Sequence, residues 1–179
     1  MSRILLAAGA SVAVYKACDL ASKLTQGGHE VRVVLTSRAA ELVNPQLFEA
    51  VTGEPAATSE WGAERRGAMD HIDLARWAEL VVVAPCSADL AGRLAQGLAN
   101  DLVTTTLLAT DTAVPRVICP AMNPSMYANP AVQRNLETLR GDGWVLVEPG
   151  SGHLACGEDG PGRLAEPAEI VERIHEVLG

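Results

Sequence analysis

Five short apolar runs alternate along the chain with segments whose apolar residues recur at helical spacing. Runs of this length, rich in Val, Ile, Leu and Ala, predict β-strands. They cover Ile4–Ala8, Val31–Leu35, Leu80–Ala84, Val117–Cys119 and Trp144–Val147. The run at Leu80–Ala84 is apolar throughout, which is typical of a strand covered on both faces.

Helices are predicted between these strands. The first ends at Gly27-Gly28 and carries an apolar stripe of Val14, Ala17, Cys18, Ala21 and Leu24. Others are predicted over Asp89–Leu108, with a break near Gly97, and over Ala131–Leu139. A final helix carries Ile170, Val171, Ile174, Val177 and Leu178 on one stripe. This alternation predicts an α/β fold, with a mainly parallel sheet and helices on both faces.

Two stretches interrupt the alternation. Gly53–Asp70 is polar and irregular, and Pro149–Glu166 contains five glycines and two prolines around Cys156. We expect both to be loops without regular structure. Loops of this length in a compact domain are usually functional or mobile.

Length and charge narrow the class of protein. A chain of 179 residues without an internal repeat or linker suits one domain, residues 1–179. The net charge of -8 argues against nucleic acid or an anionic membrane as a partner, and 3% aromatic residues leave little to stack on bases. No apolar run approaches the ~20 residues of a membrane span. We therefore expect a soluble, cytoplasmic protein.

The four cysteines favour neither a metal site nor a disulfide framework. Cys18, Cys86, Cys119 and Cys156 are widely spaced, and none has a His at ligand spacing. We expect no bound metal.

Chemistry is expected after the strands, because ligands of such sheets bind at the carboxyl ends of the strands. The segments there are Gly9-Ala10-Ser11, Thr36-Ser37, Pro85–Asp89 and Pro120–Asn123. The first is either a phosphate-binding turn or a plain tight turn in which Ser11 is a helix cap. The glycine fingerprint of a dinucleotide site is missing, and Thr36-Ser37 replaces the acidic residue that would hold the ribose of NAD. This pattern favours a mononucleotide such as FMN.

Three further residues have a structural and a functional interpretation. Alone, His71 is better explained as a structural or solvated residue, and Asn123, which precedes Pro124, as a helix cap. Cys156 lies among flexible glycines with Arg163 nearby. It is either an ordinary loop residue or a reactive thiol on a lid.

Six segments in this order resemble the homo-oligomeric flavin-containing cysteine decarboxylases, over nearly the whole chain. They are Gly9–Lys16, Met69–Leu74, Ala84–Leu90, Ala99–Val103, Pro120–Asn123 and Ala155–Glu158. The pattern is most similar to the members that convert 4′-phosphopantothenoylcysteine into 4′-phosphopantetheine in coenzyme A biosynthesis. The resemblance implies a three-layer, Rossmann-like (flavodoxin-like) domain. It also implies a homotrimer or homododecamer in which FMN lies between subunits.

The resemblance also implies roles for individual residues. His71 would be the active-site histidine, and Asn123 would hold the substrate carboxylate. Cys156 would donate a proton in the second, reductive half of the reaction. Residues of the loop and its flank, Ala155, Gly157 and Arg163, would bind substrate. Residues implied to surround FMN are Gly9, Ala10, Ser11, Thr36, Ser37, Pro85, Cys86, Ser87, Asp89 and Met122, with Ser11 and Thr36 nearest its phosphate.

The chain departs from the family at two positions. Cys86 stands where members usually have a small residue such as Ala, and Asp89 where many have Asn. The Asp89-Leu90 form is similar to the bacterial two-domain version, in which a phosphopantothenate–cysteine ligase follows. The chain is therefore either free-standing or one half of such a fusion.

The implied chemistry explains why a flavin and a thiol occur together. Carbon dioxide leaving an amide-linked cysteine needs an electron sink, and oxidation of the thiol carbon by FMN supplies one. The thiol of Cys156 suits the proton donation that accompanies return of the electrons from the reduced flavin. Peptide-cysteine decarboxylases do not need this step. A flavin prenyltransferase has no use for the Cys156 loop, and a phosphatase-regulating relative would carry long acidic extensions. These three remain as alternatives.

Overall fold

A parallel β-sheet forms the centre of the computed structural model, which describes residues 1–61, 69–155 and 157–179. Its five strands lie in the order β2-β1-β3-β4-β5, the order of flavodoxin-like folds. The strands are β1 (Arg3–Ala8), β2 (Glu30–Leu35), β3 (Leu80–Cys86), β4 (Arg116–Pro120) and β5 (Trp144–Leu146). All four neighbouring pairs are parallel, so the carboxyl ends of the strands meet at one edge.

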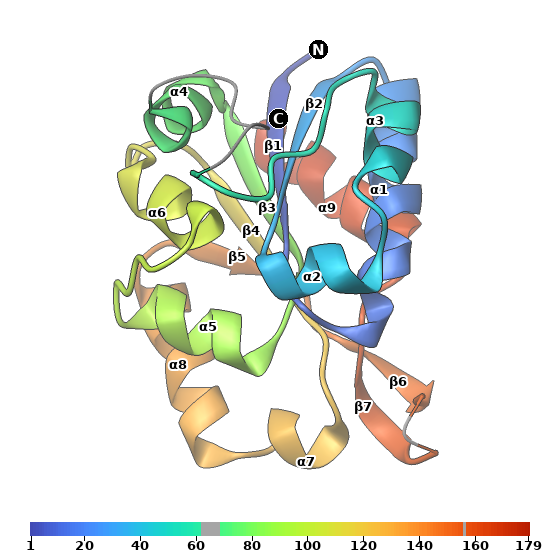
Figure 1. Cartoon of the computed structure of the whole chain (residues 1–179). Helices are drawn as coiled ribbons and strands as arrows, with labels where there is room; N and C mark the ends of the chain where they lie inside the picture. The colour runs from blue at the N-terminus through green and yellow to red at the C-terminus, as the bar shows by residue number, and fades with distance from the viewer. Residues whose placement is uncertain (62–68, 156) are drawn as a thin grey trace.

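Alternate residues of each strand face opposite layers of helices. Ile4, Leu6 and Ala8 of β1 join a core beneath one layer, and Leu5 and Ala7 join a core beneath the other. The first layer contains α1 (Tyr15–Gln26), α3 (Gln46–Thr52) and α9 (Pro167–Leu178). The second contains α4 (Asp70–Trp77), α5 (Ala88–Ala95), α6 (Leu102–Ala109) and α8 (Pro130–Gly141) (Figure 1). Every residue of β3 is buried, because both layers cover this central strand.

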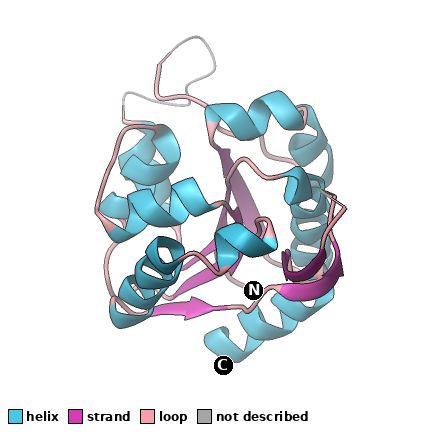
Figure 2. Cartoon of the chain, turned by 90° about the horizontal axis from the view of Figure 1, so that it is seen from below, coloured by secondary structure: helices cyan, strands magenta, loops and turns pink. Residues whose placement is uncertain are grey.

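Short elements gather at the carboxyl edge of the sheet. They are the 3-10 helix η1 (Val12–Val14), α2 (Ser37–Leu42), α7 (Pro124–Tyr127) and an antiparallel hairpin of β6 (Gly150–His153) and β7 (Asp159–Arg163). Figure 2 views the molecule from this edge, with the hairpin beside the strand ends. Ligand-binding residues are therefore expected at this edge.

The predicted α/β fold is confirmed, including its five parallel strands. Helix α1 ends before Gly27-Gly28 as predicted, and Gly28 adopts φ +85°. The break predicted near Gly97 within Asp89–Leu108 is confirmed: α5 and α6 are separate helices, and Gly97 between them adopts φ +65°.

Two predictions about the irregular stretches need correction. The loop predicted over Pro149–Glu166 contains the β6–β7 hairpin, whose strands are too rich in glycine to show apolar alternation. Gly53–Asp70 is not wholly irregular either, because Ala57 pairs with Val34 at the sheet edge and Asp70 begins α4. Helices α2 and α3, six and seven residues long, were not predicted because so few turns show little periodicity.

Within the described part of the chain, no helix combines the length and apolar character needed to cross a membrane. In the same residues, no three His, Cys, Asp or Glu side chains gather as ligands of a metal would.

Candidate functional site

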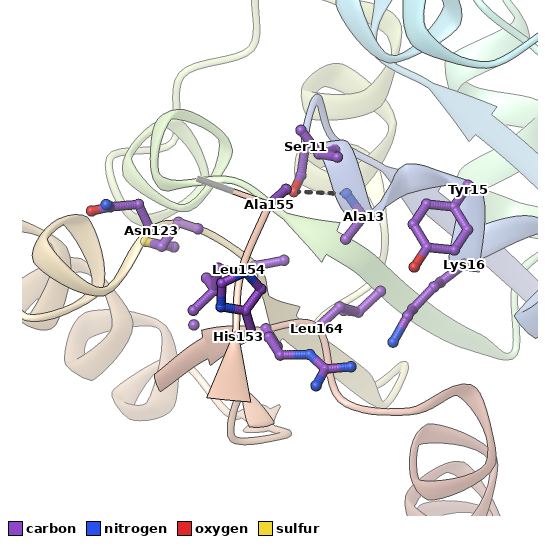
Figure 3. A pocket seen from close by; sticks show the side chains of 14 residues that line it. Ser11, Ala13, Tyr15, Lys16, Asn123, His153, Leu154, Ala155 and Leu164 are labelled. Atoms are coloured by element: carbon purple, nitrogen blue, oxygen red, sulfur yellow. Dashed lines mark hydrogen bonds between the residues drawn. The ribbon is translucent and has the colours of Figure 1, made fainter. Parts of the chain in front are cut away.

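A cavity of about 310 Å³ opens at the carboxyl edge between the start of α1, the end of β4 and the hairpin. Volumes of this order are typical of small-ligand sites. Figure 3 shows side chains from these separate elements around one space. The lining residues are Ser11, Val12, Ala13, Tyr15, Lys16, Ala121, Met122, Asn123, His153, Leu154, Ala155, Gly162, Arg163 and Leu164. Ser11, Met122, Asn123, Ala155 and Arg163 were all predicted as site residues.

The polar residues that follow four of the strands cap the next helices. Ser11 Oγ accepts from Ala13 N at 3.3 Å and Thr36 Oγ1 from Ala39 N at 3.1 Å. Ser87 Oγ accepts from Leu90 N at 3.2 Å, and Asn123 Oδ1 from Met126 N at 3.0 Å. The cap interpretations of Ser11 and Asn123 are therefore correct. A first helical turn has further amides without intrahelical partners, so this edge is rich in N–H donors that suit an anion.

Gly9 allows the ends of β1 and β3 to approach closely. Its amide donates to the Pro85 carbonyl at 2.8 Å, and a Cβ at this position would lie 2.9 Å from Leu90 Cδ2. Strand β1 lies between β2 and β3, where the chain connections change direction and where flavodoxin-like folds bind FMN. The glycine thus shapes the floor of the expected ligand site.

The position of Asn123 is fixed by α7. Because its Oδ1 accepts the cap hydrogen bond, its Nδ2 is the donor, and it donates to Glu158 Oε2 at 2.7 Å. Helix α7 is itself held by Tyr127, whose hydroxyl donates to Glu148 Oε2 at 2.7 Å. Burial, with a smaller contribution from Glu148, raises the pKa of Tyr127 to about 12.

The hairpin packs tightly against the segment that carries Asn123. Met122 N donates to the Gly162 carbonyl at 3.0 Å, and a Cβ on Gly162 (φ +131°) would lie 2.2 Å from the Met122 carbonyl oxygen. Only glycine fits there. Gly157, predicted to bind substrate, lies in the hairpin turn with φ +84° and does not line the cavity. Cys156 lies outside the described residues, so its predicted role is carried forward as a prediction.

Two cations at the cavity share one carboxylate. Lys16 Nζ lies 2.7 Å and Arg163 Nη2 3.3 Å from Glu166 Oε1. The hydrogen bond from Lys16 is the main reason why the pKa of Glu166 is lowered. Lys16 was not among the predicted site residues, although it stands one helical turn after the Ser11 turn. That spacing is the signal in the sequence that would have identified it.

His71 is not brought to this cavity within one chain. It lies in the first turn of α4, where its Nδ1 is 3.4 Å from Glu60 Oε1. Helices α4 and α7 lie at opposite ends of the molecule (Figure 1). The two predicted catalytic residues His71 and Asn123 are therefore separated in the monomer.

Several predicted flavin-binding residues lie near the strand ends without lining the cavity. Thr36 is buried at the start of α2, followed by exposed Ser37, and Ala10 is half-buried beside Gly9. The side chain of Cys86 points into the core under α5, and burial raises the pKa of its thiol. Residues such as Cys86 and Pro85 can thus face a ligand at this edge mainly through their backbone.

Asp89 takes part in a network around Arg93. Arg93 Nη2 lies 3.0 Å from Asp89 Oδ2, and Arg93 Nη1 lies 2.6 Å from Asp101 Oδ2. Asp101 also caps α6, accepting from Thr104 N at 2.8 Å. Burial acts to raise the pKa of Asp101, but the hydrogen bonds from Arg93 and Thr104 outweigh it and lower the pKa.

Comparison with known proteins places this architecture among flavoproteins. The model of the family described as "Flavoprotein" matches residues 1–179. The coenzyme A biosynthesis bifunctional protein CoaBC of Bacillus subtilis is 46% identical over 94% of this chain, and that of Escherichia coli K12 is 42% identical over 95%. In both cases the chain spans only 41% of the relative's length.

Solved structures agree with these relatives. A PPC decarboxylase variant complexed with pantothenoylaminoethenethiol superimposes with a TM-score of 0.87 at 33% identity, covering 98% of this chain and 97% of its own. The FMN binding protein AtHal3 gives a TM-score of 0.83 at 34% identity, covering 98% and 95%.

The Arg93 network predicts that substituting its two carboxylates, Asp101 and Asp89, lowers the free energy of unfolding by different amounts. Asn is also a good helix cap, so Asp101→Asn removes mainly the charge, and we expect it to lower the free energy of unfolding by about 1–3 kcal/mol at pH 7. Asp89→Asn removes an exposed i,i+4 pair and should cost less than about 0.5 kcal/mol.

The pH dependence provides the control. Because the pKa of Asp101 is lowered on folding, its contribution is present above the ordinary carboxyl range and is lost as the pH falls below about 4. Urea denaturation of wild type and both variants at pH 7 and at lower pH measures this. If the two variants lose equal free energy of unfolding, or if the loss for Asp101→Asn does not shrink in acid, the charge of Asp101 does not stabilise the fold through Arg93.

Proposed function

The chain belongs to the Flavoprotein family, and on that premise we propose that residues 1–179 form one FMN-binding decarboxylase domain. Its substrate is 4′-phosphopantothenoylcysteine, and its product is 4′-phosphopantetheine of coenzyme A biosynthesis. The observation that carries this proposal is the cavity that the Ser11 turn, Met122-Asn123, and Ala155 and Arg163 of the hairpin region line together.

The residues present fit FMN. The donor set at the carboxyl edge consists of neutral hydroxyls and helix-start amides around Ser11, Thr36 and Ser87, which suits a phosphate and a ribityl chain. The remaining residues assigned to the cofactor are Gly9, Ala10, Ser37, Pro85, Cys86, Asp89 and Met122. When bound, FMN supplies the oxidation of the cysteine side chain that allows carbon dioxide to leave, and the return of the electrons afterwards.

Asn123 recognises the carboxylate of the substrate. Its Nδ2 offers N–H donors while Oδ1 stays occupied by the cap of α7, so the amide cannot turn its oxygen toward an anion without losing that bond. A neutral donor orients the carboxylate without the full positive charge that would oppose its departure as carbon dioxide. Ala155 and Arg163 line the cavity and contribute further substrate contacts, and Lys16 adds a second cation there. Gly157 shapes the hairpin turn next to Ala155.

His71 and Cys156 carry the protons. An imidazole can take or give a proton near neutral pH, which suits His71 for proton removal during the oxidation. Cys156 donates a proton to carbon when the product is completed.

The site is shared between copies of the chain. The separation of His71 from Asn123 within one monomer supports this proposal, because both are needed in one site. We assign the assembly as a homotrimer, alone or within a homododecamer. The CoaBC relatives extend well beyond the matched region, which supports a phosphopantothenate–cysteine ligase as a fused or separate partner.

The direct test uses the purified chain. It should be yellow with bound FMN and release carbon dioxide from 4′-phosphopantothenoylcysteine. Asn123→Asp should keep FMN and helix α7, since Asp is an equally good cap, but lose decarboxylation at least about 100-fold because the new carboxylate repels that of the substrate. A colourless protein that takes up no FMN, or an active Asn123→Asp variant, would contradict the proposal. Activity only on peptides ending in cysteine would indicate a peptide-cysteine decarboxylase instead.

Subunit mixing tests the shared site. His71→Asn and Asn123→Asp chains should each be inactive, whereas co-assembled chains should regain up to about a quarter of wild-type activity, because some sites then combine two intact residues. Mixed assemblies are made by denaturing and refolding the two variants together with FMN. The control is each variant refolded alone. Mixtures that stay inactive although both chains occur in one oligomer would reject a site built from two subunits.

A further inference from the structure

We propose that Glu158 determines the affinity of the site for its substrate, by occupying the Asn123 amide until the substrate carboxylate replaces it. This inference rests on the proposed function. Its observation is the hydrogen bond of 2.7 Å from Asn123 Nδ2 to Glu158 Oε2, which joins the hairpin turn to the residue assigned to the substrate carboxylate. The side chain of Glu158 thus presents to Asn123 the same chemical group that the substrate brings.

Both partners are held in place by their own elements. The cap hydrogen bond of α7 fixes the orientation of the Asn123 amide, so Nδ2 is turned toward the hairpin. On the other side, Leu154 N donates to the Glu158 carbonyl at 2.9 Å and closes the turn that carries Glu158. Gly160, whose Cβ would lie 3.1 Å from Pro124 Cγ, lets this turn approach α7. The contact is therefore a consequence of how the hairpin packs.

Charge makes the two carboxylates competitors. The cations of the cavity, Lys16 and Arg163, pair with Glu166, and His153 Nδ1 lies 3.5 Å from Asp159 Oδ1. A substrate carboxylate that reaches Asn123 would lie beside that of Glu158, and two negative charges on one neutral amide repel. This repulsion favours the departure of Glu158 from Asn123 when substrate binds.

The exchange has different consequences for substrate and product. Substrate binding includes the cost of breaking a charge-assisted hydrogen bond, which weakens affinity without touching the chemical step. The product has lost its carboxylate and therefore does not bind the Asn123 amide. Glu158 can then form its hydrogen bond with Asn123 again. Glu158 is accordingly a specificity-determining residue, not a catalytic one.

The test compares kinetics of the FMN-loaded full chain and its Glu158→Gln variant. Gln keeps the size of the side chain but removes the charge, so KM for 4′-phosphopantothenoylcysteine should fall about three- to tenfold while kcat changes less than about twofold. Glu158→Ala, which removes the acceptor, should lower KM at least as far. The inhibition constant of 4′-phosphopantetheine, which has no carboxylate, should stay the same in all variants.

Glu172→Gln is the matched control, because it removes the same charge from an exposed position on α9 and should leave KM unchanged. If wild type releases carbon dioxide but Glu158→Gln leaves KM unchanged or raises it, the proposal for Glu158 is wrong. An equal change for substrate and product would also overturn it, since that would indicate a general effect on the hairpin. A wild-type chain that releases no carbon dioxide would overturn the proposed function together with this inference.

Discussion

Parallel strand pairing is the constraint on which the rest of the structure depends. Because β1 to β5 all run the same way, each strand delivers the chain to the same edge, where most of the following helices begin. A helix start leaves backbone N–H groups without partners, and Ser11, Thr36, Ser87 and Asn123 each accept from one of them. The residues that stabilise these turns are thereby gathered at one edge. The side chains that cap the helices are also those proposed to bind the ligand. The fold that requires the caps therefore also positions the site.

The hairpin converts this open edge into a cavity. It is held by the bond from Met122 N to Gly162 and by the bond from Asn123 to Glu158. Gly160 and Gly162 permit the close approach, and any side chain at Gly162 would meet the Met122 carbonyl. Met122 and Asn123, at the start of α7, are thus joined to the hairpin by direct hydrogen bonds. In the exchange proposed for Glu158, substrate binding at Asn123 replaces this hairpin contact.

The sequence identified the features that depend on local pattern. Apolar runs predicted the five strands, and the positions just after them predicted Ser11, Thr36 and Asn123 as edge residues. What it missed depends on long-range packing. The hairpin has no apolar alternation, and Asn123 and Glu158 are 35 residues apart in the chain. His71 lies far from the cavity because of where α4 packs. The Cys86 side chain is buried because α5 packs over it. Neither kind of packing can be recognised from the residues next to His71 or Cys86 in the sequence.

Recognition of a flavin phosphate at the carboxyl edge is the central feature of the proposed site. Titration of the flavin-free chain with FMN and with riboflavin, followed by flavin fluorescence, measures this directly. The two ligands differ only in the phosphate that the helix-start amides and hydroxyl caps are proposed to hold. FMN should bind at least about 100-fold more tightly than riboflavin. Equal affinities for the two flavins, or no binding of either, would contradict it.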